Sequence, residues 1–200
     1  YKRHFIIILI AVYFQFIRRI FRNSKISLFN ETVSLTYAIP GAVISLALII
    51  MATSTPLNSQ FLIGSFFLLI YAYVIRYMAV GISPLKSSFE KHPISYDDMA
   101  FSLGMSSFKL FKKVHYPINK PAIAVAFLIT FVDIIKELPI TLILSPFNFS
   151  TLSVQAYQYA IDEMIPKSAI YSLSIIVLGA ILLIFLKIIV NRKVDVSKNQ

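Results

Sequence analysis

Five apolar segments, separated by polar stretches, dominate the pattern of hydrophobic and polar positions along the chain. They cover roughly residues 5–17, 35–52, 61–79, 121–144 and 169–190. A helix needs about 20 apolar residues to cross a bilayer, and the four later segments approach or exceed that length. The first segment has only 13 residues, and it becomes a full span when the residues before it are counted. We therefore predict an all-α integral membrane protein with about five transmembrane helices.

The same pattern divides the chain into three parts. Residues 1–34 contain the short first transmembrane helix and a basic cytoplasmic linker. Residues 35–190 form a transmembrane core with a cytoplasmic loop over residues 82–120, and residues 191–200 form a cytoplasmic tail. Because the chain does not begin with Met, we expect a fragment or a trimmed form of a longer protein.

The distribution of basic residues predicts how the helices cross the membrane. Fifteen of the 19 Lys and Arg residues fall on one side if the N-terminus is placed outside. Cytoplasmic loops are enriched in Lys and Arg, so the N-terminus is predicted outside, and the C-terminus and the 82–120 loop inside. The formal net charge of +10 also fits nucleic-acid binding. Because the basic residues flank the apolar segments, we interpret them as topology determinants and expect no nucleic-acid partner.

Residue types exclude several other classes of protein. At 58% hydrophobic residues, the composition differs from that of an ordinary soluble domain. The chain has no Cys, which excludes a disulfide framework or a thiolate metal site. His4, His92 and His115 show no metal-ligand spacing, and His115 is expected to be only an interfacial residue. Neither a Walker loop nor a nucleophile with a partner base is visible, so we predict no enzyme, no metal and no bound cofactor.

The long polar segment before the fourth apolar run has the pattern of two short helices joined at a glycine. Ser95 with Asp98 three residues later is typical of a capping box at a helix start. Gly104 can adopt the positive φ at which the first helix ends. A Ser at residues 106–107 is expected to cap the second helix, which must end before Pro117.

This segment resembles the cytoplasmic coupling motif of ABC importer permeases, which is Glu-Ala-Ala, three residues, Gly, nine residues, Ile-x-Leu-Pro. The spacing matches throughout, and the matching residues are Asp98, Met99, Ala100, Gly104, Val114, Tyr116 and Pro117. Asp98 replaces Glu, Met99 replaces Ala, Val114 replaces Ile and Tyr116 replaces Leu. In that family the loop docks into a groove on the ATPase subunit and transmits its motion. Residue types alone also fit an amphipathic loop that lies on membrane lipid headgroups.

The fourth apolar segment carries charges that a lipid-facing helix disfavours. Asp133, Lys136 and Glu137 interrupt it, and their spacing of three and four residues places them on one side of a helix. Each charge at membrane depth costs about 2.5–3.5 kcal/mol, so the three should face a polar interior or form pairs. Pro139 favours a kink just beyond them. Two interpretations remain open: a self-neutralising pair of Asp133 and Lys136 at a helix interface, or a polar lining of a translocation path or gate.

The same region resembles the ferric-iron branch of these permeases more narrowly. The matching residues are Lys136 to Leu142, Pro146 to Phe149, Thr151, Leu152, Ala156 and Tyr157, with Tyr37 to Gly41 as a weaker match. Ser145 stands where members of that branch usually carry Arg. The resemblance implies ferric iron as the substrate. Permeases of the same branch that import phosphonates or thiamine share much of the pattern.

Together these resemblances imply a type I permease subunit of an ABC importer in the bacterial inner membrane. The implied partners are a cytoplasmic ATPase that uses ATP, a periplasmic substrate-binding protein, and a second permease half or an identical copy. Because members of the iron branch usually carry two coupling loops and this chain has one, it is half of a duplicated permease or pairs with a second chain. The alternative class is a secondary transporter or channel that uses Asp133, Lys136 and Glu137 as an ion relay.

Overall fold

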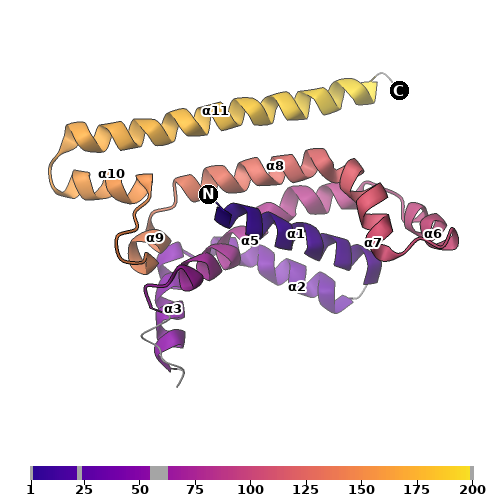
Figure 1. Cartoon of the computed structure of the whole chain (residues 1–200), viewed down its shortest axis with the longest axis horizontal. Coiled ribbons are helices and arrows are strands. Elements are labelled where there is room, and N and C mark those ends of the chain that lie inside the picture. Colours follow the sequence, from indigo (N-terminus) through magenta and orange to yellow (C-terminus); the bar gives the residue numbers. More distant parts are fainter. Residues whose placement is uncertain (1, 22–23, 55–62, 199–200) are drawn as a thin grey trace.

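The computed structural model describes residues 2–21, 24–54 and 63–198, and within these ranges every regular element is helical (Figure 1). The elements in chain order are α1 (Lys2–Phe21), α2 (Ser24–Leu35), η1 (Thr36–Ala38), α3 (Gly41–Ser54), α5 (Phe66–Glu90), α6 (Ser95–Ser102), α7 (Ser107–Leu110), η2 (Phe111–His115), α8 (Tyr116–Ile135), α9 (Pro139–Leu144), α10 (Leu152–Ile161) and α11 (Ile165–Lys198). The predicted all-α fold is confirmed. α11 includes most of the segment predicted as a tail.

Helix α5 is the centre of the structure, because α1 and α8 pack along it and α2, α3 and α9 also touch it (Figure 1). Its buried side chains include Leu69, Tyr73, Ile82 and Leu85, which are almost fully removed from solvent. Burial of large apolar side chains contributes about 1.5–3 kcal/mol each, so this face organises the core. α11 lies along α10 and α8 with its apolar side chains exposed, as suits a helix that faces lipid or a partner.

Among the described residues, three helices are long and apolar enough to cross a membrane, and their bounds are Phe66–Glu90, Ser107–Ile135 and Ile165–Val190. A fourth span is possible if the bent pair Glu31–Ala38 and Gly41–Ser54 counts as one, with an angle of 108° between its halves. These findings support a membrane-spanning helical protein. The count of five spans and the orientation with the N-terminus outside stay predictions.

The fourth predicted segment differs from the structure at both ends. Helical structure begins at Ser107, because α7, the π-helical turn η2 and α8 follow one another without a gap. It ends at Ile135, and α9 begins only at Pro139. The chain therefore breaks at residues 136–138, where the sequence predicted a kink. The second predicted segment also bends, since η1 and α3 meet at Ile39 and Pro40.

The prediction that the second loop helix ends before Pro117 was wrong. The Tyr116 N–H donates to the Phe111 carbonyl oxygen, five residues back, which makes η2 a π turn. Pro117 then lies in the first turn of α8, where its missing N–H costs least. The side-chain amide of Asn119 donates to the His115 carbonyl at 2.8 Å, so this carbonyl oxygen has a hydrogen-bond partner within the turn. The π turn lets the helix continue past the proline.

The two predicted caps of this loop were also wrong. Ile94, rather than Ser95, occupies the position before α6, and it makes no side-chain capping bond. The Asp97 N–H donates instead to the Ile94 carbonyl at 2.9 Å. Ser106 does precede α7 with extended backbone, but its hydroxyl makes no capping bond. Backbone turns therefore replace the expected side-chain caps.

Cysteine labelling tests the predicted orientation directly, because the natural chain has no Cys. Exposed positions suit this experiment, such as Ser106 before α7 and Asp162 between α10 and α11. We expect Ser106→Cys to react only with reagents that enter the cytoplasm and Asp162→Cys with impermeant reagents outside. Reversed labelling would contradict the N-out orientation. Ser59, between the second and third apolar segments, is also predicted outside, but it lies beyond the described residues.

Candidate functional site

The turn between α6 and α7 has the backbone that the sequence predicts. Gly104 has a φ of 72°, in the left-handed region, so this prediction is confirmed. Its N–H donates to the Phe101 carbonyl at 2.9 Å, and the Met105 N–H donates to the Ala100 carbonyl at 3.0 Å. A Cβ on Gly104 would meet nothing within 4 Å. The glycine is therefore needed for its backbone angle and not for close packing.

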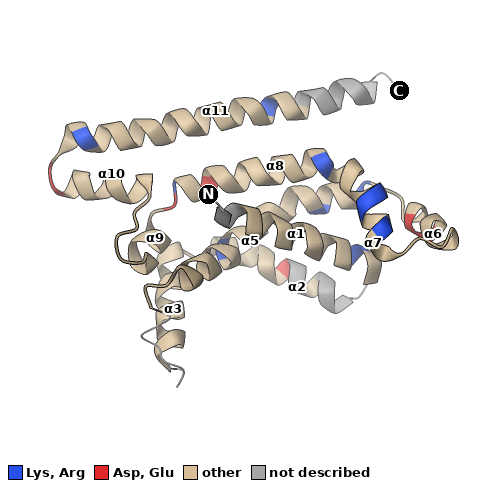
Figure 2. Cartoon of the chain, in the orientation of Figure 1, with Lys and Arg blue, Asp and Glu red and all other residues tan. Residues whose placement is uncertain are grey.

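Large apolar side chains are exposed around this turn, and they are Met99, Phe101, Leu103 and Phe108. Leu103 is 82% exposed and Phe108 is 73% exposed. Basic residues occur on α7, η2 and the start of α8, where Figure 2 shows blue ribbon, and they are Lys109, Lys112, Lys113 and Lys120. Several large apolar side chains exposed on one short loop indicate an interaction surface. We name these four apolar residues the loop patch.

The seven motif residues fall into two groups. Asp98, Met99, Gly104, Tyr116 and Pro117 are exposed. Ala100 is buried against the structure and Val114 is half-buried. The motif is therefore mostly a surface feature, and Ala100 is its one fully buried residue.

The residues that hold the loop are not apparent from the sequence, because their partners are far apart in the chain. The Arg19 Nε donates to the Asp97 carboxylate at 2.6 Å, across 78 positions. The other carboxylate oxygen of Asp97 lies 2.8 Å from the His115 Nε2. All three side chains are buried. We name Arg19, Asp97 and His115 the loop triad.

The expectation that His115 is only an interfacial residue was wrong, because its side chain is 3% exposed. Its ring stacks on Phe89 of α5, with centroids 5.4 Å apart, and contacts the edge of Phe16 of α1 at 5.4 Å. The aromatic packing fixes the ring so that its Nε2 faces Asp97. Asp97 and His115 lie 18 positions apart, on either side of the turn. Local spacing rules connect residues three or four positions apart, so they do not reveal this contact.

At the other end of α8, the predicted cluster of three charges is divided. The Lys136 Nζ lies 2.7 Å from the Asp133 carboxylate, and the Lys136 side chain is 59% exposed. The Tyr37 hydroxyl approaches the other Asp133 oxygen at 3.4 Å. This pair matches the self-neutralising interpretation, with the difference that its cation faces outward.

Glu137 does not join that pair, so the prediction that all three charges share one side was wrong. α8 ends at Ile135, and the chain then turns Glu137 inward, where it is 7% exposed. Its carboxylate accepts from the Tyr77 hydroxyl and, at 3.2 Å, from the Ile140 N–H. Arg76, which the sequence did not point to, places its Nε 3.6 Å away.

Arg76 links this carboxylate to the bend before α3. One of its guanidinium nitrogens donates to the Ile39 carbonyl, and the guanidinium lies over the rings of Tyr37 and Tyr77 at 5.6 and 5.9 Å. Gly41 begins α3 here. A Cβ on it would stand 2.8 Å from a Glu137 carboxylate oxygen and 3.0 Å from the Ile140 side chain. Two interruptions of helical structure therefore meet at one ion pair, in which Glu137 is buried and Arg76 is half-buried.

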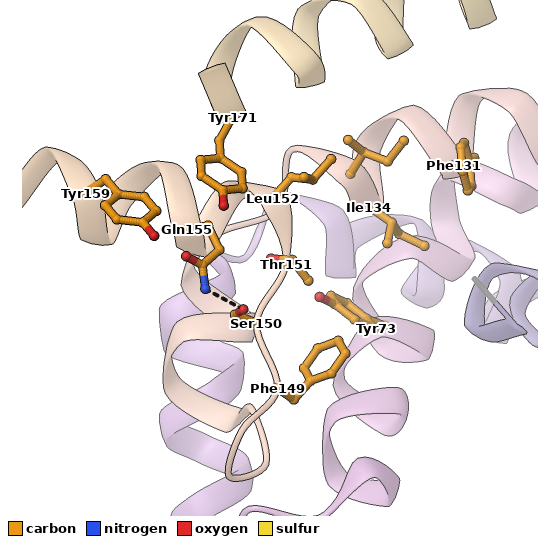
Figure 3. Close-up of a pocket in the computed structure, with 11 residues that line it drawn as sticks. Tyr73, Phe131, Ile134, Phe149, Ser150, Thr151, Leu152, Gln155, Tyr159 and Tyr171 are labelled. Atoms are coloured by element: carbon orange, nitrogen blue, oxygen red, sulfur yellow. Dashed lines mark hydrogen bonds between the residues drawn. The ribbon is translucent and has the colours of Figure 1, made fainter. Parts of the chain in front are cut away.

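A cavity of about 670 Å³ lies next to the break, between α8, α10 and α11 (Figure 3). Its lining residues are Tyr73, Phe131, Ile134, Ile135, Phe149, Ser150, Thr151, Leu152, Gln155, Tyr159 and Tyr171. The Tyr159 and Tyr171 rings stack with centroids 5.4 Å apart. The lining therefore combines aromatic surfaces with hydroxyl and amide groups. The predicted site residues Asp133, Lys136, Glu137 and Pro139 are not part of it.

Long apolar helices and a break inside one apolar segment, next to a cavity of mixed apolar and polar lining, are typical of an integral membrane protein with an internal path or binding site. The chain belongs to the family of binding-protein-dependent transport system inner membrane components, which matches residues 5–195. It is accordingly a multi-pass protein of the inner membrane. The predicted membership of the chain in the ABC importer permeases is confirmed by this match, and the coupling role of the loop residues stays a prediction.

Curated relatives place the similarity more closely. The chain is 29% identical over 153 residues to the Fe(3+)-transport system permease protein FbpB 2 of Haemophilus influenzae, a match that covers 76% of this chain and 30% of that protein. It is 32% identical over 92 residues to the maltose/maltodextrin transport system permease protein MalG of Vibrio vulnificus, covering 46% of this chain and 31% of that protein. The chain thus spans less than a third of these relatives. The resemblance to the ferric-iron branch agrees with the first match.

The contact between Gly41 and Glu137 yields a testable prediction. Gly41→Ala forces a methyl group against the Glu137 carboxylate and the Ile140 side chain, and overpacking of this kind costs about 1–3 kcal/mol of unfolding free energy. Gly179→Ala is the matched control, because nothing lies within 4 Å of a Cβ at that position. We expect thermal unfolding in detergent to shift down for Gly41→Ala only. Equal unfolding temperatures for both variants would contradict the described meeting of α3 and the break.

Proposed function

We propose that this chain is a permease subunit of an ABC importer, driven by a separate ATPase that uses ATP in the cytoplasm. The observation that carries the proposal is the turn at Gly104, with the motif residues and the loop patch exposed around it. An ATPase subunit that docks on the loop patch covers these apolar side chains and leaves the basic residues at its rim. Family membership favours this mechanism over a secondary transporter or channel.

Transport of a solute by this subunit requires further partners. A periplasmic substrate-binding protein delivers the solute on the side opposite the loop, as the family's description as binding-protein-dependent implies. A second permease half or an identical copy of this chain completes the path. The exposed apolar surface of α11 is available for that partner or for membrane lipid.

The break between α8 and α9 is the proposed gate region of the path. Lys136 and Asp133 present an ion pair whose cation faces outward, and this pair is suited to a polar lining. Glu137 and Pro139 set the position of the break itself, since Glu137 accepts from the first turn of α9. In this proposal the three charges have different roles: Asp133 and Lys136 line the path, and Glu137 fixes the position of the break.

Ferric iron is the proposed cargo. The support is the similarity to the iron permease over 76% of this chain, together with the residues around Lys136 to Leu142 that resemble the iron branch. Phosphonate and thiamine remain the alternatives within that branch.

A sugar is the second candidate cargo, favoured by the composition of the cavity. Stacked Tyr159 and Tyr171 rings, with the Gln155 amide and the Ser150 hydroxyl beside them, suit a neutral hydroxylated solute (Figure 3).

Uptake of radiolabelled ferric iron and of maltose by the same membranes separates the two cargos. Tyr159→Ala and Tyr171→Ala should lower uptake of a cargo that uses the cavity, and unchanged uptake would remove the cavity from the path.

Substitution of Gly104 tests the proposed docking turn. Left-handed backbone costs a β-branched residue about 1–3 kcal/mol, whereas Asn tolerates it well. We expect Gly104→Val to insert normally but to lose ATP-driven uptake, and Gly104→Asn to retain most of it. Both variants are measured for membrane yield and for uptake in the same vesicles. Full uptake with Gly104→Val at normal yield would contradict the assignment of this turn.

A further inference from the structure

The loop helix α6 makes few contacts with the helices around it in the part of the chain that the structure describes. A cavity of about 340 Å³ lies between α6 and the end of α1. Arg19, Ile20 and Phe21 line it on the α1 side, and Asp97, Asp98 and Phe101 on the α6 side. α6 is therefore not held against α1 by continuous apolar packing at this point. The ion pair between Arg19 and Asp97 bridges the gap.

Arg19 uses its whole guanidinium group at this site. Besides the bond from its Nε to Asp97, its other nitrogens donate to the carbonyls of Phe89, His92 and Pro93, at 3.1 Å for His92 and 2.9 Å for Pro93. These carbonyls belong to the end of α5 and to the link between α5 and α6. One side chain of α1 therefore holds the end of α5 and the start of α6 together. A Lys has three donors on a flexible stem and cannot reproduce this planar arrangement.

The second oxygen of Asp97 carries the connection further, to His115 at 2.8 Å. His115 ends η2 and directly precedes α8, the helix that leads to the break at residues 136–138. The loop triad thus joins α1, α6 and η2, which leads directly into α8, through two bonds to a single carboxylate. A displacement of α6 stretches both bonds at once, because both end on Asp97. Buried charges that lose their partners are strongly disfavoured, so the loop triad resists being pulled apart.

We propose that Arg19 is a positioning residue for coupling, which transmits the movement of α6 to α1 through Asp97. This inference rests on the proposed function, since it assumes that an ATPase docks on the loop patch and moves it. The loop patch receives the ATPase, and the loop triad passes its displacement to the membrane helices. Arg19 therefore affects how much solute is moved for each ATP hydrolysed, while leaving the docking surface itself unchanged.

The neighbouring Arg18 is a matched control. Its guanidinium pairs with Glu90 at 2.9 Å, but the Glu90 side chain is 52% exposed. Exposed pairs contribute little to stability, and this one joins α1 to the end of α5. Arg18→Gln removes the same charge one position away and should leave coupling unaffected.

The experiment uses the full-length chain assembled with its ATPase and substrate-binding protein in liposomes. For wild type, Arg19→Gln, Arg19→Lys and Arg18→Gln, it measures retention of the ATPase during purification, thermal unfolding, ATP hydrolysis and solute uptake. We expect Arg19→Gln to retain the ATPase and to lower uptake per ATP by about tenfold, a usual size for coupling between two sites. Arg19→Lys should fall between, and Arg18→Gln should match wild type.

Each outcome has a distinct meaning. If no ATPase is retained by the wild-type chain, the proposed function fails. If wild type and Arg19→Gln retain the ATPase and show equal uptake per ATP, the role assigned to Arg19 fails while the proposed function stands. If Arg19→Gln unfolds too early to assemble, Asp97→Asn and His115→Gln serve instead, because both keep hydrogen-bonding groups in place. Equal uptake per ATP in those two variants and in wild type overturns the proposal as well.

Discussion

A helix that stops inside an apolar segment frees backbone groups, and lipid offers them no partners. In this protein the carboxylate of Glu137 meets that constraint at the break between α8 and α9, because it accepts from the Ile140 N–H at the start of α9. The same carboxylate receives the Tyr77 hydroxyl and lies beside Arg76, both on α5. Ser153 donates to the Glu137 carbonyl at 2.6 Å, which also ties α10 to the break. The arrangement of α3, α9 and α10 around α5 depends on this one residue.

A second ion pair, which is buried, lies beside the C-terminal end of α5, whereas Arg76 and Tyr77 lie near the middle of that helix. Arg19 and Asp97 join α1 to α6 there, as Arg76 and Glu137 join α5 to the break. Buried ion pairs gain little net stability, but they are costly to disrupt and therefore favour one arrangement of the groups around them. A transport subunit needs such an arrangement at the surface that receives a partner and at the region that opens. The central helix α5 contacts both.

Local features of the sequence predicted part of the fold and part of the candidate site. The apolar segments predicted the helical membrane fold, and the left-handed turn at Gly104 follows from the conformational freedom of glycine. Features that depend on distant residues were missed. Arg19 and Asp97 are 78 positions apart, and Tyr77 and Glu137 are 60 apart. No local spacing rule connects them. The continuation past Pro117 depends on a π turn, whose five-residue hydrogen bond the helix patterns did not anticipate.

We expect an ATP-hydrolysing subunit to dock on the loop patch. Photocrosslinking tests this docking, with a photoreactive amino acid placed at Leu103, the most exposed member of the patch, and at Ile184 of α11 as a control. Irradiation of the assembled transporter in membranes, followed by mass spectrometry, identifies what each position touches. If the ATPase subunit docks on the loop patch, Leu103 crosslinks to that subunit, and Ile184 crosslinks to lipid or a permease partner. A Leu103 position that crosslinks to lipid alone, while the ATPase is present in the complex, would contradict it.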